Sequence, residues 1–136
     1  MRNELFIFDT NTIVSVFLAR NSVPAFAFDR ARKEGHIVMC QEVYQEISNV
    51  LVRAKFDKYL STTIRMSLLE DLKNEVIFVE PHDFITACRD PKDDIYLFLA
   101  VSANAMCIVT GDKDLLILNP FRTIPIINAA TFLSSF

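Results

Sequence analysis

Acidic residues follow two apolar segments of the chain, at positions where their carboxylates could meet. Asp9 comes directly after the run Leu5–Phe8, and Asp112 comes shortly after the run Met106–Val109. If both runs are buried parallel strands, their carboxyl ends lie at one edge of the sheet, where open α/β folds place their sites. Each acid also has a structural interpretation, because Asp9 could cap the next helix and Asp112 could belong to a turn.

Glu46 is a third candidate, and it falls within an amphipathic segment. It lies three residues after Val43 and four before Val50, so it borders the apolar stripe of an expected helix, Glu42–Val52. An acid at the edge of such a stripe is common in helices that have no catalytic function. The position therefore allows a role in a site without requiring one.

The segment Asp90-Pro-Lys-Asp-Asp94 begins the most apolar helix that the sequence predicts, Pro91–Ala103. Asp90 is a natural N-cap, Pro91 suits the first helical position, and Asp93 stands at the capping-box position. Capping thus explains Asp90 and Asp93, but it does not explain Asp94, which enters a helix with hardly any polar side. A carboxylate there needs a partner, and a metal ion is one.

The chemistry of these four acids points to a hard divalent cation. The chain has only two histidines, so a ring of carboxylate oxygens favours Mg²⁺ or Mn²⁺ over zinc. Such ions activate water and stabilise the negative charge that develops during phosphodiester cleavage. Asp114 is a less certain fifth acid, and it could instead cap a short helix that follows it.

Alternating strands and helices must position these side chains. Short apolar runs without polar alternation suit a parallel sheet that is covered on both faces. We expect strands at Leu5–Phe8, His36–Met39, Val76–Val79 and Met106–Val109, with an edge strand at Thr123–Ile127 where Pro125 lies. We expect helices at Thr12–Leu18, Pro24–Lys33, Glu42–Val52, Ser61–Asn74, Pro91–Ala103 and Asn128–Leu133. This order predicts a layered α/β fold with right-handed crossovers.

Length and composition favour a single cytoplasmic domain over residues 1–136. The chain is 51% hydrophobic, but its longest apolar runs fall short of the roughly 20 residues that a membrane span needs. The start of the chain does not resemble a secretory signal. The three cysteines are widely spaced, so we expect reduced thiols and no disulfide. The net charge of −3 argues against purely charge-driven binding of nucleic acid, although metal ions held by acids can reverse the local sign.

Four motifs in order resemble the PIN-domain nucleases. They are Phe-Asp9-Thr-Asn11, Val43-Tyr-Gln-Glu46-Ile, Arg89-Asp-Pro-Lys-Asp-Asp94 and Val109-Thr-Gly-Asp112-Lys-Asp114-Leu. The set spans nearly the whole chain and is most similar to the toxin branch of prokaryotic toxin–antitoxin systems, the relatives of VapC.

The resemblance implies a five-stranded parallel sheet of order 3-2-1-4-5 with helices on both sides. It also implies endonuclease activity on RNA that depends on Mg²⁺ or Mn²⁺. Matched residue by residue, the acidic positions of the family fall on Asp9, Glu46, Asp94 and Asp112, and its polar neighbours fall on Asn11 and Thr110. Relatives of VapC form homodimers and are blocked by an antitoxin protein, so both partners are expected here.

Other residues admit weaker interpretations. The stretch Arg53–Lys58 is locally basic, with Phe56 and Tyr59 close by. It could contact an RNA backbone or base, or it could be a solvated helix end. His36 and His82 have no histidine or cysteine at ligand spacing, so we expect no catalytic role for them.

Two alternatives to a nuclease remain open from the sequence. A phosphatase of the HAD type also places an Asp after its first strand, but it needs a second Asp two positions later, where this chain has Asn11. A PIN fold retained only for assembly is the other alternative, and the complete acidic set argues against it.

Overall fold

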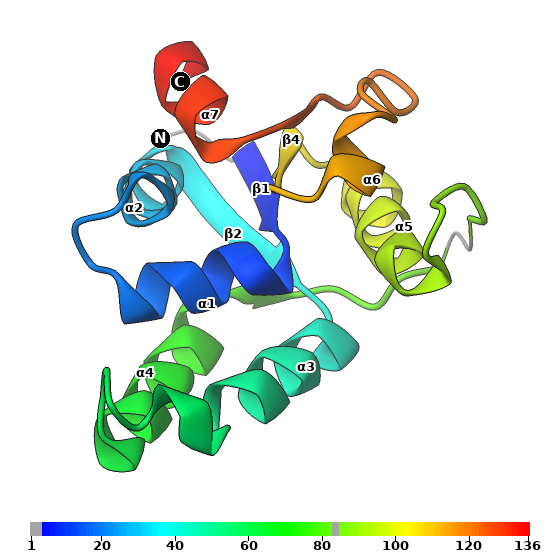
Figure 1. The fold of residues 1–136 in the computed structure, drawn as a ribbon. Helices are drawn as coiled ribbons and strands as arrows, with labels where there is room; N and C mark the ends of the chain where they lie inside the picture. Colours follow the sequence, from blue (N-terminus) through cyan, green and yellow to red (C-terminus); the bar gives the residue numbers. More distant parts are fainter. Residues whose placement is uncertain (1–3, 83–84) are drawn as a thin grey trace.

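A parallel sheet forms the centre of the molecule (Figure 1). The structure is a computed structural model that describes residues 4–82 and 85–136. Within these residues the strands are β1 (Glu4–Phe8), β2 (Gly35–Met39), β3 (Ile77–Phe78), β4 (Cys107–Val109) and β5 (Ile126–Ile127). All neighbouring strands pair in parallel, in the order β3-β2-β1-β4-β5. The expected sheet order is therefore confirmed.

Helices connect the strands at nearly the expected places. They are α1 (Thr10–Leu18), α2 (Val23–Glu34), α3 (Gln41–Leu51), α4 (Thr62–Glu75), α5 (Asp94–Ala103), α6 (Lys113–Leu116) and α7 (Ala129–Ser135), with 3₁₀ turns η1 (Ala54–Phe56) and η2 (Pro91–Asp93). The expected helix Pro91–Ala103 is thus divided into a 3₁₀ turn and α5. The expected strand Thr123–Ile127 is shorter because Arg122 and Thr123 adopt positive φ in a turn closed by Phe121 and Ile124.

The two faces of β1 are covered by different helices. Phe6 and Phe8 point to one face, where edge-to-face ring contacts join Phe8 to Phe28 of α2 and both residues to Phe132 of α7. Successive strand residues point to opposite faces, so Ile7 points to the other face, on which α5 contacts β1, β2 and β4. The helices on both sides bury the second half of β1, where Phe6, Ile7 and Phe8 are at most 1% exposed.

The apolar helix α5 is packed on every side, as its sequence predicts. None of its residues is classed as exposed, and Leu97, Leu99 and Ala100 are fully buried. Among the described residues, no helix combines the length and apolar character needed to cross a membrane.

The buried face of α4 includes a charged residue. Ile64 is 49% exposed, whereas Arg65 is fully buried and shares the buried face with Leu69 and Leu72. Hydrophobic periodicity alone does not reveal this face, because the stem and guanidinium of an arginine can be buried when carbonyl oxygens accept its hydrogen bonds.

Cys40 and Cys107 are buried, Cys88 is half-buried, and all three thiols are free. Burial raises the pKa of Cys107 to about 12, and it also raises the pKa of Cys88 to about 12 with a contribution from Asp94. These thiols are therefore protonated at neutral pH and poorly nucleophilic.

Candidate active site

Asp9 and Asp112 lie at the same edge of the sheet, linked by Thr110. Asp9 follows β1, and Thr110 follows the neighbouring parallel strand β4. The Thr110 hydroxyl donates to Asp9 Oδ2 at 2.5 Å and accepts from the backbone N–H of Asp112 at 3.0 Å. The expected juxtaposition of the two acids after adjacent strands is therefore confirmed.

Asp9 combines a structural contact with a position in the cluster. Its Oδ1 accepts from the backbone N–H of Thr12 at 3.0 Å and so caps α1, and its side chain is almost completely buried. Burial raises the pKa of Asp9, opposed by hydrogen bonds from Thr110 and Thr12, and the negative charge of Asp112 raises it further. A nearby cation would relieve both unfavourable effects.

Asp112 is both a helix cap and a second acid of the cluster. Its Oδ1 accepts from the backbone N–H of Asp114 at 2.8 Å, which makes Asp112 the N-cap of α6. From the sequence, Asp114 was the alternative candidate for a helix cap here. Asp114 instead lies in the first turn of α6 and contacts Asp112 through its backbone.

The structure gives Asp93 and Asp94 different surroundings. Asp94 is buried, and its Oδ1 accepts from the backbone N–H groups of Ala87 at 3.0 Å and Cys88 at 2.7 Å. Burial alone would raise the pKa of Asp94, but these hydrogen bonds together lower it. The carboxylate that the sequence left without a structural partner thus fixes the segment that precedes η2.

Asp93 is the member of this pair that faces the other acids. Burial, the charge of Asp112 and a hydrogen bond to Asp112 raise the pKa of Asp93 to about 7, with smaller contributions from Asp90 and Asp9. Asp93 makes no capping hydrogen bond, whereas Asp90 caps η2 by accepting from the backbone N–H of Lys92 at 3.0 Å. The structure therefore brings Asp9, Asp112 and Asp93 together.

Glu46 is held by the hydroxyl groups of Thr10 and Tyr96, neither of which was a candidate from the sequence. Thr10 donates to Glu46 Oε1 through a short hydrogen bond, and the Tyr96 hydroxyl donates to the same oxygen at 3.2 Å. Tyr96 also accepts from the backbone N–H of Thr10 at 3.0 Å. Because Thr10 directly follows Asp9, this network links Glu46 of α3 to the cap of α1.

The sequence carried a signal for these missed residues. A tyrosine inside an apolar helix needs a hydrogen-bond partner for its hydroxyl, and Tyr96 is the tyrosine of α5. Asp93 was missed because its cap position offered a sufficient local explanation. Its contact with Asp112 distinguishes it from Asp94, whose carboxylate accepts from the backbone of Ala87 and Cys88.

An open cavity of about 590 Å³ lies beside the acids. Asp9, Thr110 and Asp112 form one side of it, and the exposed Asn11 also lines it. Asn128, at the start of α7, also lines the cavity. A cavity of this size is in the range of small-molecule sites.

The donor set fits a hard divalent cation. Within residues 4–82 and 85–136, no group of three or more Asp, Glu, His or Cys side chains is placed so that it could hold a metal ion. Mg²⁺ can be bound by fewer protein ligands, because it keeps several waters and is bound by one or two carboxylates together with substrate phosphates. Asp9 and Asp112 supply such carboxylates. Burial raises the pKa of Asp9, and burial together with the charge of Asp112 raises the pKa of Asp93, so a nearby cation would favour the charged form of both.

Known proteins resemble this chain in sequence and in fold. A family model described as PIN domain matches residues 6–114. An uncharacterized protein of Methanocaldococcus jannaschii, MJ1680, is 27% identical over 112 residues, covering 81% of this chain and 72% of that protein.

Solved structures share the fold at low identity. PAE2754 from Pyrobaculum aerophilum has a TM-score of 0.64 at 14% identity, covering 98% of this chain and 97% of that chain. VapBC2 from Rickettsia felis, bound to a DNA fragment from their promoter, has a TM-score of 0.63 at 14% identity, covering 91% of this chain and 98% of that chain.

Proposed function

This chain belongs to the PIN-domain family, and on that premise we propose that it is an endoribonuclease that cleaves single-stranded RNA with the help of Mg²⁺ or Mn²⁺. The observation that carries the proposal is the contact of Asp9 and Asp112 through Thr110 at the carboxyl edge of the sheet, beside an open cavity. Membership of this family sets aside the phosphatase alternative. A PIN fold without activity is the alternative that an activity assay must exclude.

Each acid has a distinct role in this proposal. Asp9 and Asp112 hold the metal ion, and Asp93 is the third acid beside them. When bound, the ion lowers the pKa of water and stabilises negative charge on the scissile phosphate. Glu46, held by Thr10 and Tyr96, orients the attacking water or ligates the ion. Asp94, proposed from the sequence as a ligand, instead positions the segment that carries Asp93.

The neighbouring polar residues support this machinery. Thr110 orients the Asp9 carboxylate through its hydroxyl. Asn11 lies exposed on the wall of the cavity, where its amide can contact substrate oxygens. Asp114 is close enough to Asp112 to serve as a further acid.

We further propose that the chain is the toxin of a toxin–antitoxin pair that acts in the cytoplasm. This rests on the resemblance to the VapC branch and on the fold shared with VapBC2 from Rickettsia felis. The expected partners are a second copy of the chain and an antitoxin protein, in addition to RNA.

End-group analysis of cleaved RNA tests the proposed chemistry. A 5′-labelled single-stranded RNA incubated with the protein and Mn²⁺ should give fragments that carry a 5′-phosphate and a 3′-hydroxyl, because in this proposal water attacks the phosphorus and the 3′-oxygen leaves and takes up a proton. EDTA should stop the reaction. Cleavage that survives EDTA, or products with 2′,3′-cyclic phosphate ends, would show that the mechanism is wrong. Protein that binds Mn²⁺ but cleaves no RNA would favour the inactive module.

Metal ions should stabilise the protein more at neutral than at acidic pH. The pKa of Asp93 is raised from 3.8 to about 7, so between these values the folded protein binds more protons than the unfolded chain. The free energy of unfolding without metal should therefore fall as the pH rises from about 4 to about 7. A bound cation displaces the proton from Asp93 and removes the repulsion between Asp93 and Asp112.

Thermal unfolding with and without millimolar Mg²⁺ or Mn²⁺ measures this linkage. The melting temperature should rise more with metal at pH 7.5 than at pH 5. Asp93→Asn is the matched variant, and it should flatten the pH dependence of the metal-free protein. A melting temperature that neither ion changes at either pH would contradict a metal site.

A further inference from the structure

The connection between α3 and α4, residues 52–61, carries a cluster of cations. Arg53, Lys55 and Lys58 are all exposed there, in a chain whose net charge is −3. Asp57 is the only acid of the segment. We call residues 52–61 the basic loop.

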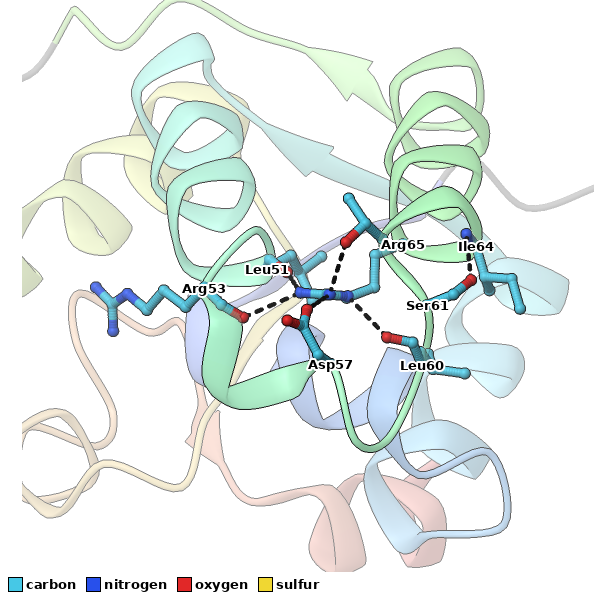
Figure 2. Close-up of polar contacts among 8 residues, drawn as sticks. Leu51, Arg53, Asp57, Leu60, Ser61, Ile64 and Arg65 are labelled. Carbon is cyan, nitrogen blue, oxygen red and sulfur yellow. Dashed lines mark hydrogen bonds and ion pairs between the residues drawn. The ribbon is translucent and has the colours of Figure 1, made fainter.

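Arg65 of α4 holds the basic loop in one conformation (Figure 2). Its fully buried side chain donates to the carbonyl oxygens of Leu51 at 2.6 Å, Arg53 at 3.0 Å and Leu60 at 3.1 Å. It also forms an ion pair with Asp57. These contacts satisfy carbonyl groups that the ends of α3 and η1 would otherwise leave without partners. The shape of the loop is therefore set before any ligand binds.

The ion pair with Arg65 also changes the charge that the loop presents. Because Asp57 is paired with a buried cation, its negative charge does not offset the exposed cations. The side chain of Arg53 extends away from Arg65 in Figure 2, while only its backbone oxygen takes part in the network. Arg53, Lys55 and Lys58 thus form a preorganised positive surface, which lowers the entropic cost of binding an anion.

Aromatic rings lie within the same surface. The ammonium of Lys55 is 5.1 Å from the centre of the Phe56 ring, and that of Lys58 is 5.1 Å from the centre of the Tyr59 ring. Tyr59 is 58% exposed. Cations interleaved with an exposed ring match the surfaces that bind single-stranded nucleic acids, where phosphates pair with cations and bases stack on rings.

Helix α3 connects the basic loop to the candidate active site. Glu46 lies in α3, and the residues from Ile47 to Val52 carry no charge, so no acid on this path would repel a phosphate backbone. From Glu46 to Arg53 the chain advances about 10 Å if each residue adds about 1.5 Å. An oligonucleotide of a few units can therefore contact both places.

We propose that the basic loop is a docking surface for the single-stranded RNA substrate, with phosphates on Lys55 and Lys58 and a base stacked on Tyr59. This rests on the proposed function, since it assigns the partner of the loop from the substrate of the same protein. The acids cleave the strand, and the basic loop holds it on one side of the cleavage point.

Binding of a fluorescein-labelled 12-nucleotide uridine RNA in EDTA tests the proposal without cleavage. Lys55→Ala combined with Lys58→Ala should weaken binding about tenfold or more at low salt. It should also reduce the slope of log K against log salt concentration by about 1.4, at about 0.7 for each phosphate contact. Tyr59→Ala should weaken binding and leave this slope unchanged, because stacking releases no counterions.

A matched control removes the same number of charges elsewhere. Lys33 and Lys73 are exposed in the last turns of α2 and α4, and their double replacement by Ala should bind like the wild type. Equal loss in both double variants would mean that only net charge matters, and it would overturn the proposal. The proposal would also be overturned if the variant lacking Lys55 and Lys58 bound the RNA with unchanged affinity. It would likewise be overturned if this variant lost affinity only for an acidic peptide such as oligo-glutamate and not for RNA.

The same experiment separates this inference from the proposed function. Wild-type protein that binds the RNA through the loop but never cleaves it would retain the docking surface and remove the nuclease assignment. If the wild-type protein cleaves RNA and the loop variants bind RNA normally, the nuclease assignment is retained and the docking surface is overturned. Unchanged melting temperatures of the variants confirm that the loop remains folded, because these lysines are exposed.

Discussion

Asp9→Asn should reduce metal-dependent cleavage of RNA on the order of a thousandfold. The substitution keeps the size of the side chain but removes a negative charge from the position best placed to hold the ion. A bound ion contributes several kcal/mol of charge stabilisation, and each 1.4 kcal/mol corresponds to a factor of about ten in rate. The measurement is the single-turnover cleavage rate of a labelled RNA at saturating Mn²⁺.

The fold should tolerate this substitution, which makes the loss of rate interpretable. The side-chain oxygen of an asparagine can still accept from Thr12 and cap α1, as Asp9 does at 3.0 Å. Its amide nitrogen can donate to the Thr110 hydroxyl oxygen, in place of the hydrogen bond that Asp9 now accepts. Asp71→Asn, at an exposed acid of α4, is the control with the same change of charge. If Asp9→Asn cleaves within a few-fold of this control, Asp9 is not a metal ligand.

Much of the fold could be predicted because its signals are local. The central strands are short apolar runs, and several helices have a recognisable start, such as Ser22 before α2 and Ser61 before α4. The alternation of strands and helices then favours a parallel sheet. The length of the edge strand β5 was overestimated because it depends on the turn at Arg122 and Thr123. These residues have positive φ values, which a glycine in the sequence would have indicated, but neither residue is a glycine.

The candidate site was predictable only to the level of its segments. Asp9 and Asp112 could be placed from sequence because both follow predicted parallel strands, whose carboxyl ends lie at one edge of the sheet. The family resemblance implied that the two strands are neighbours, and the structure pairs them. The choice between Asp93 and Asp94 depends on a rotation of about 100° around a helix axis, which follows from 3.6 residues per turn. A single residue of error in where the helix begins exchanges the two side chains, and η2 introduces such an error before α5.

Buried polar groups explain the remaining differences. Arg65 occupies a core position because five acceptors, supplied by the backbone and side chains of residues 51–62, surround its guanidinium. Tyr96 also occupies a core position, because Thr10 and Glu46 form hydrogen bonds with its hydroxyl. In both cases the partners are distant in sequence or lie in a loop, so no pattern of hydrophobic residues reveals them.

The exchange of roles between Asp93 and Asp94 leads to a second prediction with a large effect. Asp93→Asn should lower the cleavage rate by about a hundredfold or more, because it removes the third acid beside Asp9 and Asp112. The metal-free protein should become more stable at pH 7.5, since the pKa of Asp93 is raised and its ionisation at that pH opposes folding.

Asp94→Asn should show the opposite pattern in stability. Its carboxylate accepts hydrogen bonds from the backbone of Ala87 and Cys88, and a charged acceptor contributes about 2 kcal/mol in such contacts. The pKa of Asp94 is lowered, so its contribution to stability is present above the ordinary pKa of 3.8 and is lost as the pH falls through the lower value of the folded state. Asp94→Asn should therefore lower the melting temperature at pH 7.5.

The two variants are isosteric changes at adjacent residues, so each is the control of the other. Chemical denaturation at pH 7.5 without metal gives the free energy of unfolding, and Mn²⁺ titration followed by melting temperature gives the affinity for metal. Asp93→Asn should bind Mn²⁺ more weakly while unfolding at higher denaturant, and Asp94→Asn should unfold at lower denaturant while its folded fraction keeps most of its affinity. If Asp94→Asn instead loses metal binding with unchanged stability, Asp94 is the ligand that the sequence motif indicated, and the hydrogen bonds from Ala87 and Cys88 must open when the ion binds.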